Sequence, residues 1–234
     1  IYVMANTFQI AIDGPVAAGK GTTAKMVAQR LGFLYVDTGA MYRSLTLYAK
    51  RNGVNLENES AITELLKKAN PKIELSIPIE SEKDTRLCTV KLNGEDVSWA
   101  IRTEDISRGV SIITQYGGVR DYITPMAREI AKTQNVVMEG RDITTVVLPD
   151  ADLKIHMDAD PHERAERRHR ELLTRGEDVS YEEVYDKLME RDKRDSGREI
   201  APLKKARNAW ILDTTGMNID QVADIIVKRV EERK

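Results

Sequence analysis

The chain is poor in cysteine, long apolar runs and net charge, and each shortage excludes a class of protein. Its single cysteine, Cys88, cannot form an internal disulfide, which is typical of a reducing, cytoplasmic compartment. No apolar run approaches the roughly 20 residues of a transmembrane helix, and we expect no secretory signal. Lys and Arg number 36 against 38 Asp and Glu, so the net charge of -2 creates no overall attraction for nucleic acid or an anionic membrane.

Several catalytic patterns are also missing. The histidines, His156, His162 and His169, have neither the spacing of a zinc site nor that of a catalytic triad. The sequence contains no Gly-x-Ser-x-Gly elbow and no dinucleotide-binding Gly-x-Gly-x-x-Gly. Its 234 residues fit one large domain, or one core with a small insert.

The most informative stretch runs from Ile10 to Thr22, where an apolar strand leads into a Gly-x-x-x-x-Gly-Lys loop and then a helix. Such a loop wraps main-chain N–H groups around an anion, and Lys20 reaches the outer phosphates. Gly21 stands where the general motif has Ser or Thr, so Thr22 offers the hydroxyl for a metal ion. An ordinary strand-to-helix turn is the alternative. The predicted phosphate-binding residues are Gly14, Pro15, Val16, Ala17, Ala18, Gly19, Lys20, Gly21 and Thr22.

Strand-like and helix-like segments alternate along the chain, which predicts an α/β fold with a parallel sheet flanked by helices. Apolar strands are expected at 8–12, 33–36, 136–139, 153–157 and 209–212. Helices are expected at 20–31, 38–50, 60–69, 103–115, 119–132, 181–195 and 219–232, with another starting near Pro161. We assign 4–70 and 98–234 to the core, 163–198 to a helical lid and 71–97 to a small β-rich insert, where Asn93-Gly94 predicts a hairpin turn.

Polar residues follow several of these strands, and ligands bind at the carboxyl ends of parallel strands. Asp37-Thr38-Gly39 opens a helix that either Asp37 or Thr38 can cap. Gly140-Arg141-Asp142 follows a buried strand. The fork of Arg141 suits a phosphate and Asp142 can accept hydrogen bonds from an amine, although a structural Arg–Asp pair remains the alternative.

A charged segment at 190–198 places Arg191, Asp195 and Arg198 on one helical face if the helix persists through Gly197. A second basic stripe, on the preceding helix, consists of Arg164, Arg167 and Arg168. These faces are either solvated stripes or a mobile lid that brings cations over a transferring phosphoryl group.

Taken together, these motifs resemble those of bacterial cytidylate kinases, which belong to the nucleoside monophosphate kinase group of P-loop proteins. The resemblance extends from Ile10 onward and rests on segments 12–22, 37–43, 101–103, 140–147, 163–168 and 190–203. It implies a P-loop kinase fold, a monomer, and transfer of the γ-phosphate of ATP to CMP or dCMP with Mg²⁺. Val16-Ala17 replaces the commoner small polar residue and Gly, and Thr144 stands where the family usually has Gly.

The resemblance also implies roles for individual residues. The phosphoryl-transfer residues would be Lys20, Arg141, Arg164, Arg168, Arg191 and Arg194. The acceptor phosphate would be bound by Thr38, Tyr42, Arg43 and Arg141. The cytosine would be surrounded by Ser111, Arg120, Asp142 and Arg198, and the sugar approached by Arg191 and Asp195. Thr22 and Asp37 are the candidates for Mg²⁺, directly or through water.

Three alternatives remain open at this point. The first is a kinase of the same fold that acts on UMP, AMP or a non-nucleotide alcohol. The second is a nucleotide-responsive module without catalysis. The third is an RNA-binding protein that uses the basic helix at 163–175, which the net charge of -2 disfavours.

Overall fold

The computed structural model describes residues 7–78 and 86–233. The chain forms two compact units: unit 1 comprises 1–7 and 33–136, and unit 2 comprises 8–32 and 137–234. In the described residues no helix is long and apolar enough to cross a membrane.

Unit 2 is built on a parallel sheet whose strands in this unit follow the order β6-β1-β7-β8. The strands are β1 (Gln9–Asp13), β6 (Val136–Gly140), β7 (Leu153–Asp158) and β8 (Trp210–Asp213). β1 pairs with β7 so that Ile12 lies opposite Ile155 and Asp13 opposite His156. Their apolar side chains are fully buried, as expected for strands covered on both faces.

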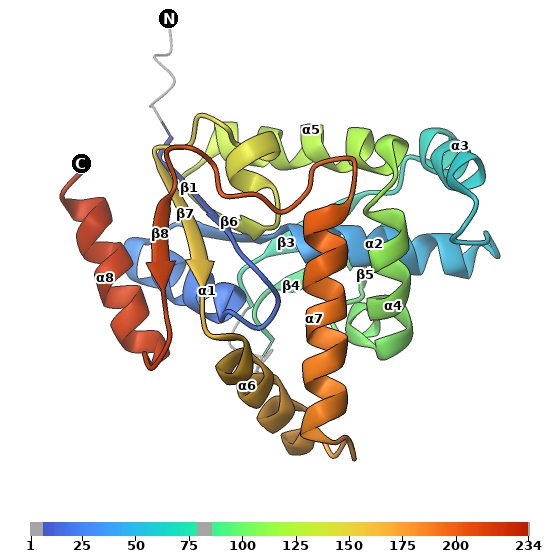
Figure 1. The fold of residues 1–234 in the computed structure, drawn as a ribbon. Coiled ribbons are helices and arrows are strands. Elements are labelled where there is room, and N and C mark those ends of the chain that lie inside the picture. Colours follow the sequence, from blue (N-terminus) through green and yellow to red (C-terminus); the bar gives the residue numbers. More distant parts are fainter. Residues whose placement is uncertain (1–6, 79–85, 234) are drawn as a thin grey trace, which may run out of the picture. The chain divides into compact units, whose positions relative to one another are not determined.

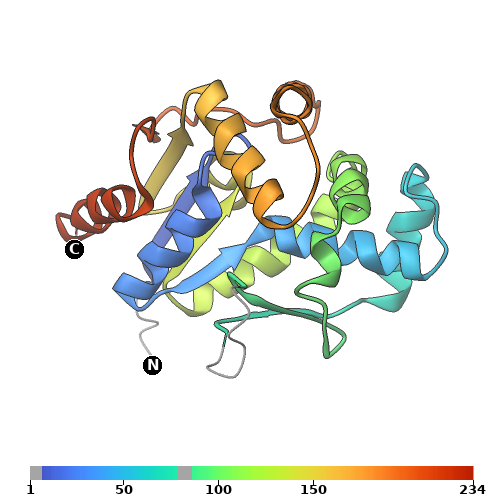
Figure 2. The same cartoon turned by 90° about the horizontal axis from the view of Figure 1, so that it is seen from below.

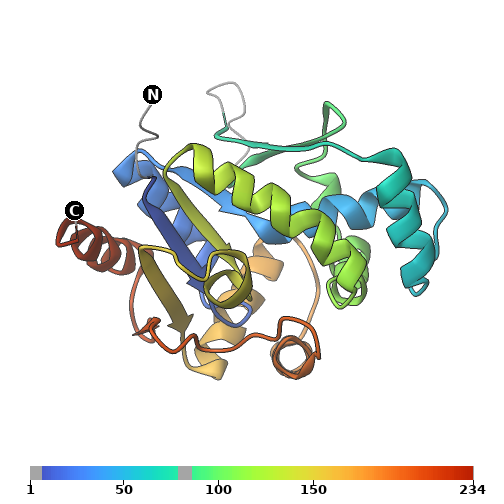
Figure 3. The ribbon, with the colours of Figure 1, turned by 90° about the horizontal axis from the view of Figure 1, so that it is seen from above.

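Helices cover this sheet because each presents an apolar face. α1 (Lys20–Leu31) packs against α8 (Ile219–Glu231) (Figure 1). Gly32, in the left-handed conformation at φ 67°, ends α1. α1 lies on one face of the strands (Figure 2), and the π-helical turn Ile143–Val147 after β6 lies on the other (Figure 3).

Two charged helices of unit 2, α6 (Pro161–Thr174) and α7 (Tyr181–Gly197), pack against each other. Aromatic rings contribute to this packing: His162 stacks on Tyr185 with 4.7 Å between ring centroids. Nδ1 of His162 also lies 2.9 Å from the Tyr181 hydroxyl. The two helices therefore form a hairpin with its own side-chain contacts.

The described residues of unit 1 form β2 (Leu34–Asp37), four α-helices, a 3₁₀ turn (Ala100–Arg102) and a small antiparallel sheet in the order β3-β4-β5. The sheet strands are β3 (Ile73–Ser76), β4 (Thr89–Leu92) and β5 (Glu95–Asp96). The helices are α2 (Thr38–Arg51), α3 (Glu59–Ala69), α4 (Glu104–Ile113) and α5 (Gly117–Thr133). Asn93 and Gly94 both have positive φ, at 52° and 85°, and form the expected hairpin turn between β4 and β5.

The predicted parallel sheet with flanking helices and the β-rich character of 71–97 are confirmed, and 79–85 within that insert lie outside the described residues. α7 persists through Gly197 as the shared charged face requires, and Arg198 is its C-cap with extended backbone. The π-helical turn at Ile143–Val147 was not predicted. The division into a core, a lid and an insert stays a prediction.

Candidate active site

The loop between β1 and α1 has the backbone geometry of an anion-binding cradle. Gly14, Ala17 and Gly19 all have positive φ, at 152°, 59° and 82°. A Cβ on Gly14 would lie 2.0 Å from the main-chain oxygen of Met157, so only glycine fits there. In the described residues no side chain caps α1, and its first turn carries no acidic residue. The free N–H groups at its start can therefore bind an anion.

Lys20 begins α1 and is buried, with only 5% of its surface exposed. Its Nζ donates a hydrogen bond of 2.6 Å to the main-chain oxygen of Pro15. Burial, reinforced by the positive charge of Arg141, lowers the pKa of Lys20 from 10.5 to about 7. An anion bound in the loop would favour the charged form of this amine.

The loop also contacts the hairpin of α6 and α7. Arg164, which is buried, donates from Nη1 to the main-chain oxygen of Val16 at 2.9 Å and to Oδ2 of Asp192 at 2.6 Å. The N–H of Val16 donates to the other carboxylate oxygen of Asp192 at 3.2 Å. Arg164 and Asp192, one from each helix of the hairpin, thus hold the phosphate loop at Val16.

Two further charged residues, Arg141 and Asp142 in the segment after β6, lie close to side chains of the same hairpin. Nε of Arg141 donates to Oδ2 of Asp195 at 2.9 Å, and Nη2 of Arg198 lies 3.9 Å from Oδ1 of Asp142. Asp195 is buried, which by itself would raise its pKa, yet the cation of Arg141 and its hydrogen bond hold the pKa of that carboxyl below its usual value. Five of the predicted residues, Lys20 included, therefore form one charged cluster in unit 2.

The backbone behind Arg141 and Asp142 is held by a carboxylate from β1. Asp13, fully buried, accepts hydrogen bonds from the N–H groups of Ile143 and Thr144 and from the Thr144 hydroxyl. Burial raises the pKa of Asp13 from 3.8 to about 6, and these hydrogen bonds offset only part of that effect.

Unit 1 gathers a second set of predicted residues around the start of α2. Asp37 caps this helix by accepting from the N–H of Ala40 at 2.9 Å, and its other oxygen lies 3.7 Å from Arg102. Thr38 and Tyr42, which lie about one turn apart at the start of this helix, are both buried. An Nη atom of Arg43 would lie 3.2 Å from a Cβ on Gly39, so its guanidinium sits over the helix N-terminus.

The predicted cytosine-binding residues of unit 1 lie on α4 and α5. The guanidinium carbon of Arg120 is 5.7 Å from the ring centroid of Tyr42, within cation–π range. Its Nη1 also donates to the oxygen of Thr114 at 3.0 Å. Ser111, 9% exposed, has its hydroxyl 3.5 Å from the oxygen of Ser107. Tyr42 and Arg120 are thus brought together by the fold.

Two of the predicted arginines lie at the surface of their helices. Arg168 pairs with Glu171 at 2.8 Å, and Arg194 pairs with Glu190 at 2.5 Å, each within one helical turn. Exposed pairs of this kind contribute about 0.5 kcal/mol or less. Both cations can therefore leave their partners at little cost when an anionic substrate binds.

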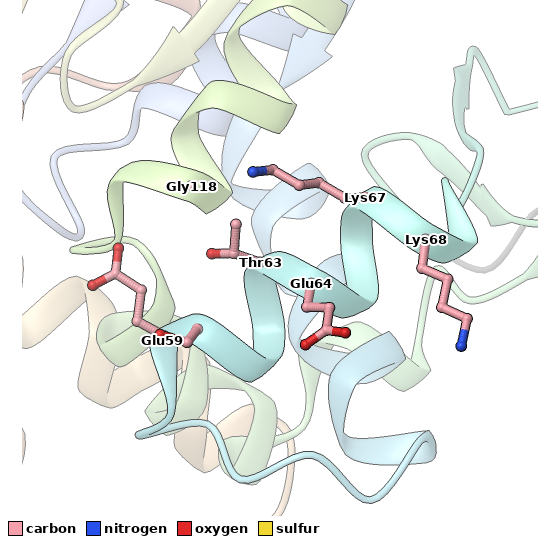
Figure 4. Close-up of a pocket in the computed structure, with 7 residues that line it drawn as sticks. Glu59, Thr63, Glu64, Lys67, Lys68 and Gly118 are labelled. Carbon is pink, nitrogen blue, oxygen red and sulfur yellow. The ribbon is translucent and has the colours of Figure 1, made fainter.

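A surface hollow of about 670 Å³ in unit 1 contains none of the predicted site residues. Figure 4 shows it along α3, with Gly118 at the start of α5. Charges of both signs line it: Glu59, Glu64, Lys67 and Lys68. This balance favours no particular ligand.

Sequence reasoning did not assign Asp13, Asp192, Thr144 or His156 to the site. The signal for Asp13 was a carboxylate at the end of an otherwise apolar strand, directly before the phosphate loop. His156 lies opposite Asp13 in the sheet, and in the part of the chain that the structure describes its buried Nδ1 has no hydrogen-bond partner. Asp192 had no distinguishing signal among the alternating charges of α7.

Comparisons with known proteins show the family of this chain. A family model described as "Cytidylate kinase" matches residues 10–232. The cytidylate kinase of Bacillus licheniformis is 46% identical over 224 residues, 96% of each chain. That of Bacillus subtilis strain 168 is 44% identical over 230 residues, 98% of this chain and 99% of the other.

Among solved structures, an uncharacterized protein from Eubacterium ventriosum ATCC 27560 superposes with a TM-score of 0.51. It is 15% identical, over 96% of this chain and 99% of the other. At this identity the likeness concerns the fold alone.

Proposed function

The chain belongs to the cytidylate kinase family, and we propose that it transfers the γ-phosphoryl group of ATP to CMP or dCMP. An oxygen of the acceptor phosphate attacks the γ-phosphorus, and the bond between that phosphorus and the β–γ bridging oxygen breaks. The products are CDP or dCDP and ADP. The observation that carries this proposal is the match to cytidylate kinases over nearly the whole chain, together with the cradle that ends at a buried Lys20.

The triphosphate is bound by the loop at 14–19 and the first turn of α1. Main-chain N–H groups surround the β-phosphate, and Lys20 neutralises charge on the β- and γ-phosphates. Arg164 is already held against the loop by Val16 and Asp192, so little reorganisation is needed to aim it at the transferring group. Arg141, Arg168, Arg191 and Arg194 add positive charge as the transition state spreads negative charge over its oxygens.

The family resemblance assigns acceptor binding to three sets of residues. Thr38, Tyr42, Arg43 and Arg141 hold its phosphate, and Arg191 and Asp195 approach the sugar. Ser111, Arg120, Asp142 and Arg198 surround the cytosine, where the Asp142 carboxylate accepts from the exocyclic amine that uracil lacks. The acceptor phosphate is an anion at neutral pH, so the reaction needs no strong general base.

When bound with ATP, Mg²⁺ would neutralise part of the negative charge of the triphosphate. No cluster of three acidic, histidine or cysteine side chains that could hold a metal ion occurs among residues 7–78 and 86–233. This fits an ion held mainly by phosphate oxygens and water. Thr22, exposed on the first turn of α1, offers one hydroxyl. Asp37 has carboxylate lone pairs that its helix-capping hydrogen bond does not use.

The net charge of -2 and the single cysteine support a protein that acts on small nucleotides in a reducing cytoplasm, without nucleic acid or membrane. We infer that it acts as a monomer, as the family resemblance suggests. Gel filtration with light scattering at micromolar concentration tests this inference.

The deciding experiment measures ADP release from ATP against a panel of CMP, dCMP, UMP, AMP and GMP. We expect kcat/KM with CMP and dCMP to exceed that with UMP by at least 100-fold, since a pocket that pairs a buried carboxylate with an amine rejects a base that lacks this amine. Equal turnover with every acceptor would contradict cytosine specificity. ATP binding without any acceptor-dependent ADP release would contradict kinase activity.

A further inference from the structure

The backbone that carries Arg141 and Asp142 continues into an uncommon conformation. Ile143–Val147 forms a single π-helical turn, with the N–H of Val147 donating to the oxygen of Asp142 at 3.2 Å. The N–H of Leu148 donates to the oxygen of Ile143 at 2.7 Å. A π turn is less favourable than an α-helical one, and where it occurs something else must stabilise it.

Asp13 supplies that stabilisation from the neighbouring strand. One carboxylate oxygen accepts from the N–H of Ile143 at 2.8 Å. The other accepts from the N–H of Thr144 at 2.8 Å and from its hydroxyl at 2.6 Å. The three donors compensate a carboxyl group that is wholly removed from water.

Two of these donors belong to the main chain and would be present whichever non-proline residue stood at 144. The third belongs to the Thr144 side chain, which is 1% exposed. Thr144 closely follows Arg141 and Asp142, which lie near Asp195 and Arg198.

We propose that Thr144 is a positioning residue for acceptor recognition: by bonding Asp13, it holds the π turn that presents Arg141 and Asp142. The inference rests on the proposed function, in which those two residues bind CMP. Because Asp13 directly precedes Gly14, the same carboxylate joins the acceptor-reading segment to the start of the phosphate loop. Loss of the hydroxyl loosens the segment that reads the acceptor and leaves the bonds of Lys20 and Arg164 in place.

The test compares Thr144→Val, which keeps the shape and removes the hydroxyl, with Thr144→Ser, which keeps the hydroxyl. Steady-state kinetics with CMP and with ATP as the varied substrate are measured for both. For Thr144→Val we expect the KM for CMP to rise about tenfold, the effect of one hydrogen bond to a charged group. The KM for ATP should stay within twofold of wild type, and Thr144→Ser should restore the KM for CMP to within twofold.

An unchanged KM for CMP in Thr144→Val overturns the proposal, as does an equal rise in both KM values. If Thr144→Val does not fold, Thr144→Gly takes its place, since it keeps both main-chain donors and removes only the side chain. The KM for CMP of Thr144→Gly must then rise at least threefold over that of Thr144→Ser, and equality refutes the role of the hydroxyl. A wild-type protein that does not phosphorylate CMP refutes the proposed function itself, and the Thr144 inference with it.

Discussion

Arg164 and Asp192 form a partly buried ion pair across the α6–α7 hairpin, with Nη1 2.6 Å from Oδ2, and both contact the main chain of Val16. Val16 of the phosphate loop thus donates its N–H to Asp192 and accepts at its carbonyl oxygen from Arg164. This pair keeps a guanidinium beside the loop before any substrate binds.

Arg164→Ala should lower kcat by about 100- to 1,000-fold, the usual effect of removing one preorganised charge from a transition state. Coupled ADP-release kinetics measure it. Arg170→Ala is the matched control, because Arg170 is exposed on the same helix, and it should keep wild-type kinetics. Wild-type kcat in Arg164→Ala would show that this cation serves only to hold the hairpin.

Asp142→Ala should lower kcat/KM for CMP by about 10- to 100-fold, since it removes a charged hydrogen-bond acceptor. The KM for ATP should change little. Asp150→Ala, an exposed position soon after the same turn, serves as control. An equal loss with CMP and UMP would contradict the reading of the exocyclic amine by Asp142.

ATP binding at pH 8 should be accompanied by uptake of a proton on Lys20. Burial, followed by the charge of Arg141, lowers the pKa of this amine to about 7 in the free protein, and a bound triphosphate favours the charged form. Calorimetry in two buffers of different ionisation enthalpy measures the uptake. It should disappear in Lys20→Met and persist in Lys25→Met, a change on the same helix. No buffer dependence in the wild type would contradict the prediction.

The contribution of Asp13 to the unfolding free energy should fall as the pH rises from about 4 to 6. Burial raises its pKa from 3.8 to about 6, so the folded state binds more protons than the unfolded state in that window, and stability falls as they are released. The difference in unfolding free energy between wild type and Asp13→Asn should therefore shift by up to about 3 kcal/mol. Urea unfolding at pH 4.5 and 6.5 measures it, and a constant difference would refute it.

Gly14→Ala should destabilise the protein by more than about 3 kcal/mol, because the new Cβ would meet a main-chain oxygen that cannot move away. Gly32→Ala is the matched control. Gly32 also has positive φ, but a Cβ there meets nothing within 4 Å, so about 1 kcal/mol is expected. Similar losses in thermal unfolding for both variants would show that backbone strain alone explains the effect.

Local chemistry made much of the fold predictable. The start of α1 at Lys20 and its end before Gly32 coincide with the prediction, since a left-handed glycine closes the helix. Of the two candidate caps for α2, the structure selects Asp37. The hairpin at Asn93-Gly94 follows from residues that accept positive φ.

By itself, the sequence determined the phosphate loop, the order of strands and helices and the family, because these depend on spacing and on neighbouring residues. Tertiary structure alone decided which charges meet. Asp13 bonds Thr144 across 131 residues, and Arg164 reaches Val16 across 148. The spacing of residues along the sequence does not predict such contacts. They form only when the folded sheet brings the ends of its strands together, and burial then makes each unpaired charge costly.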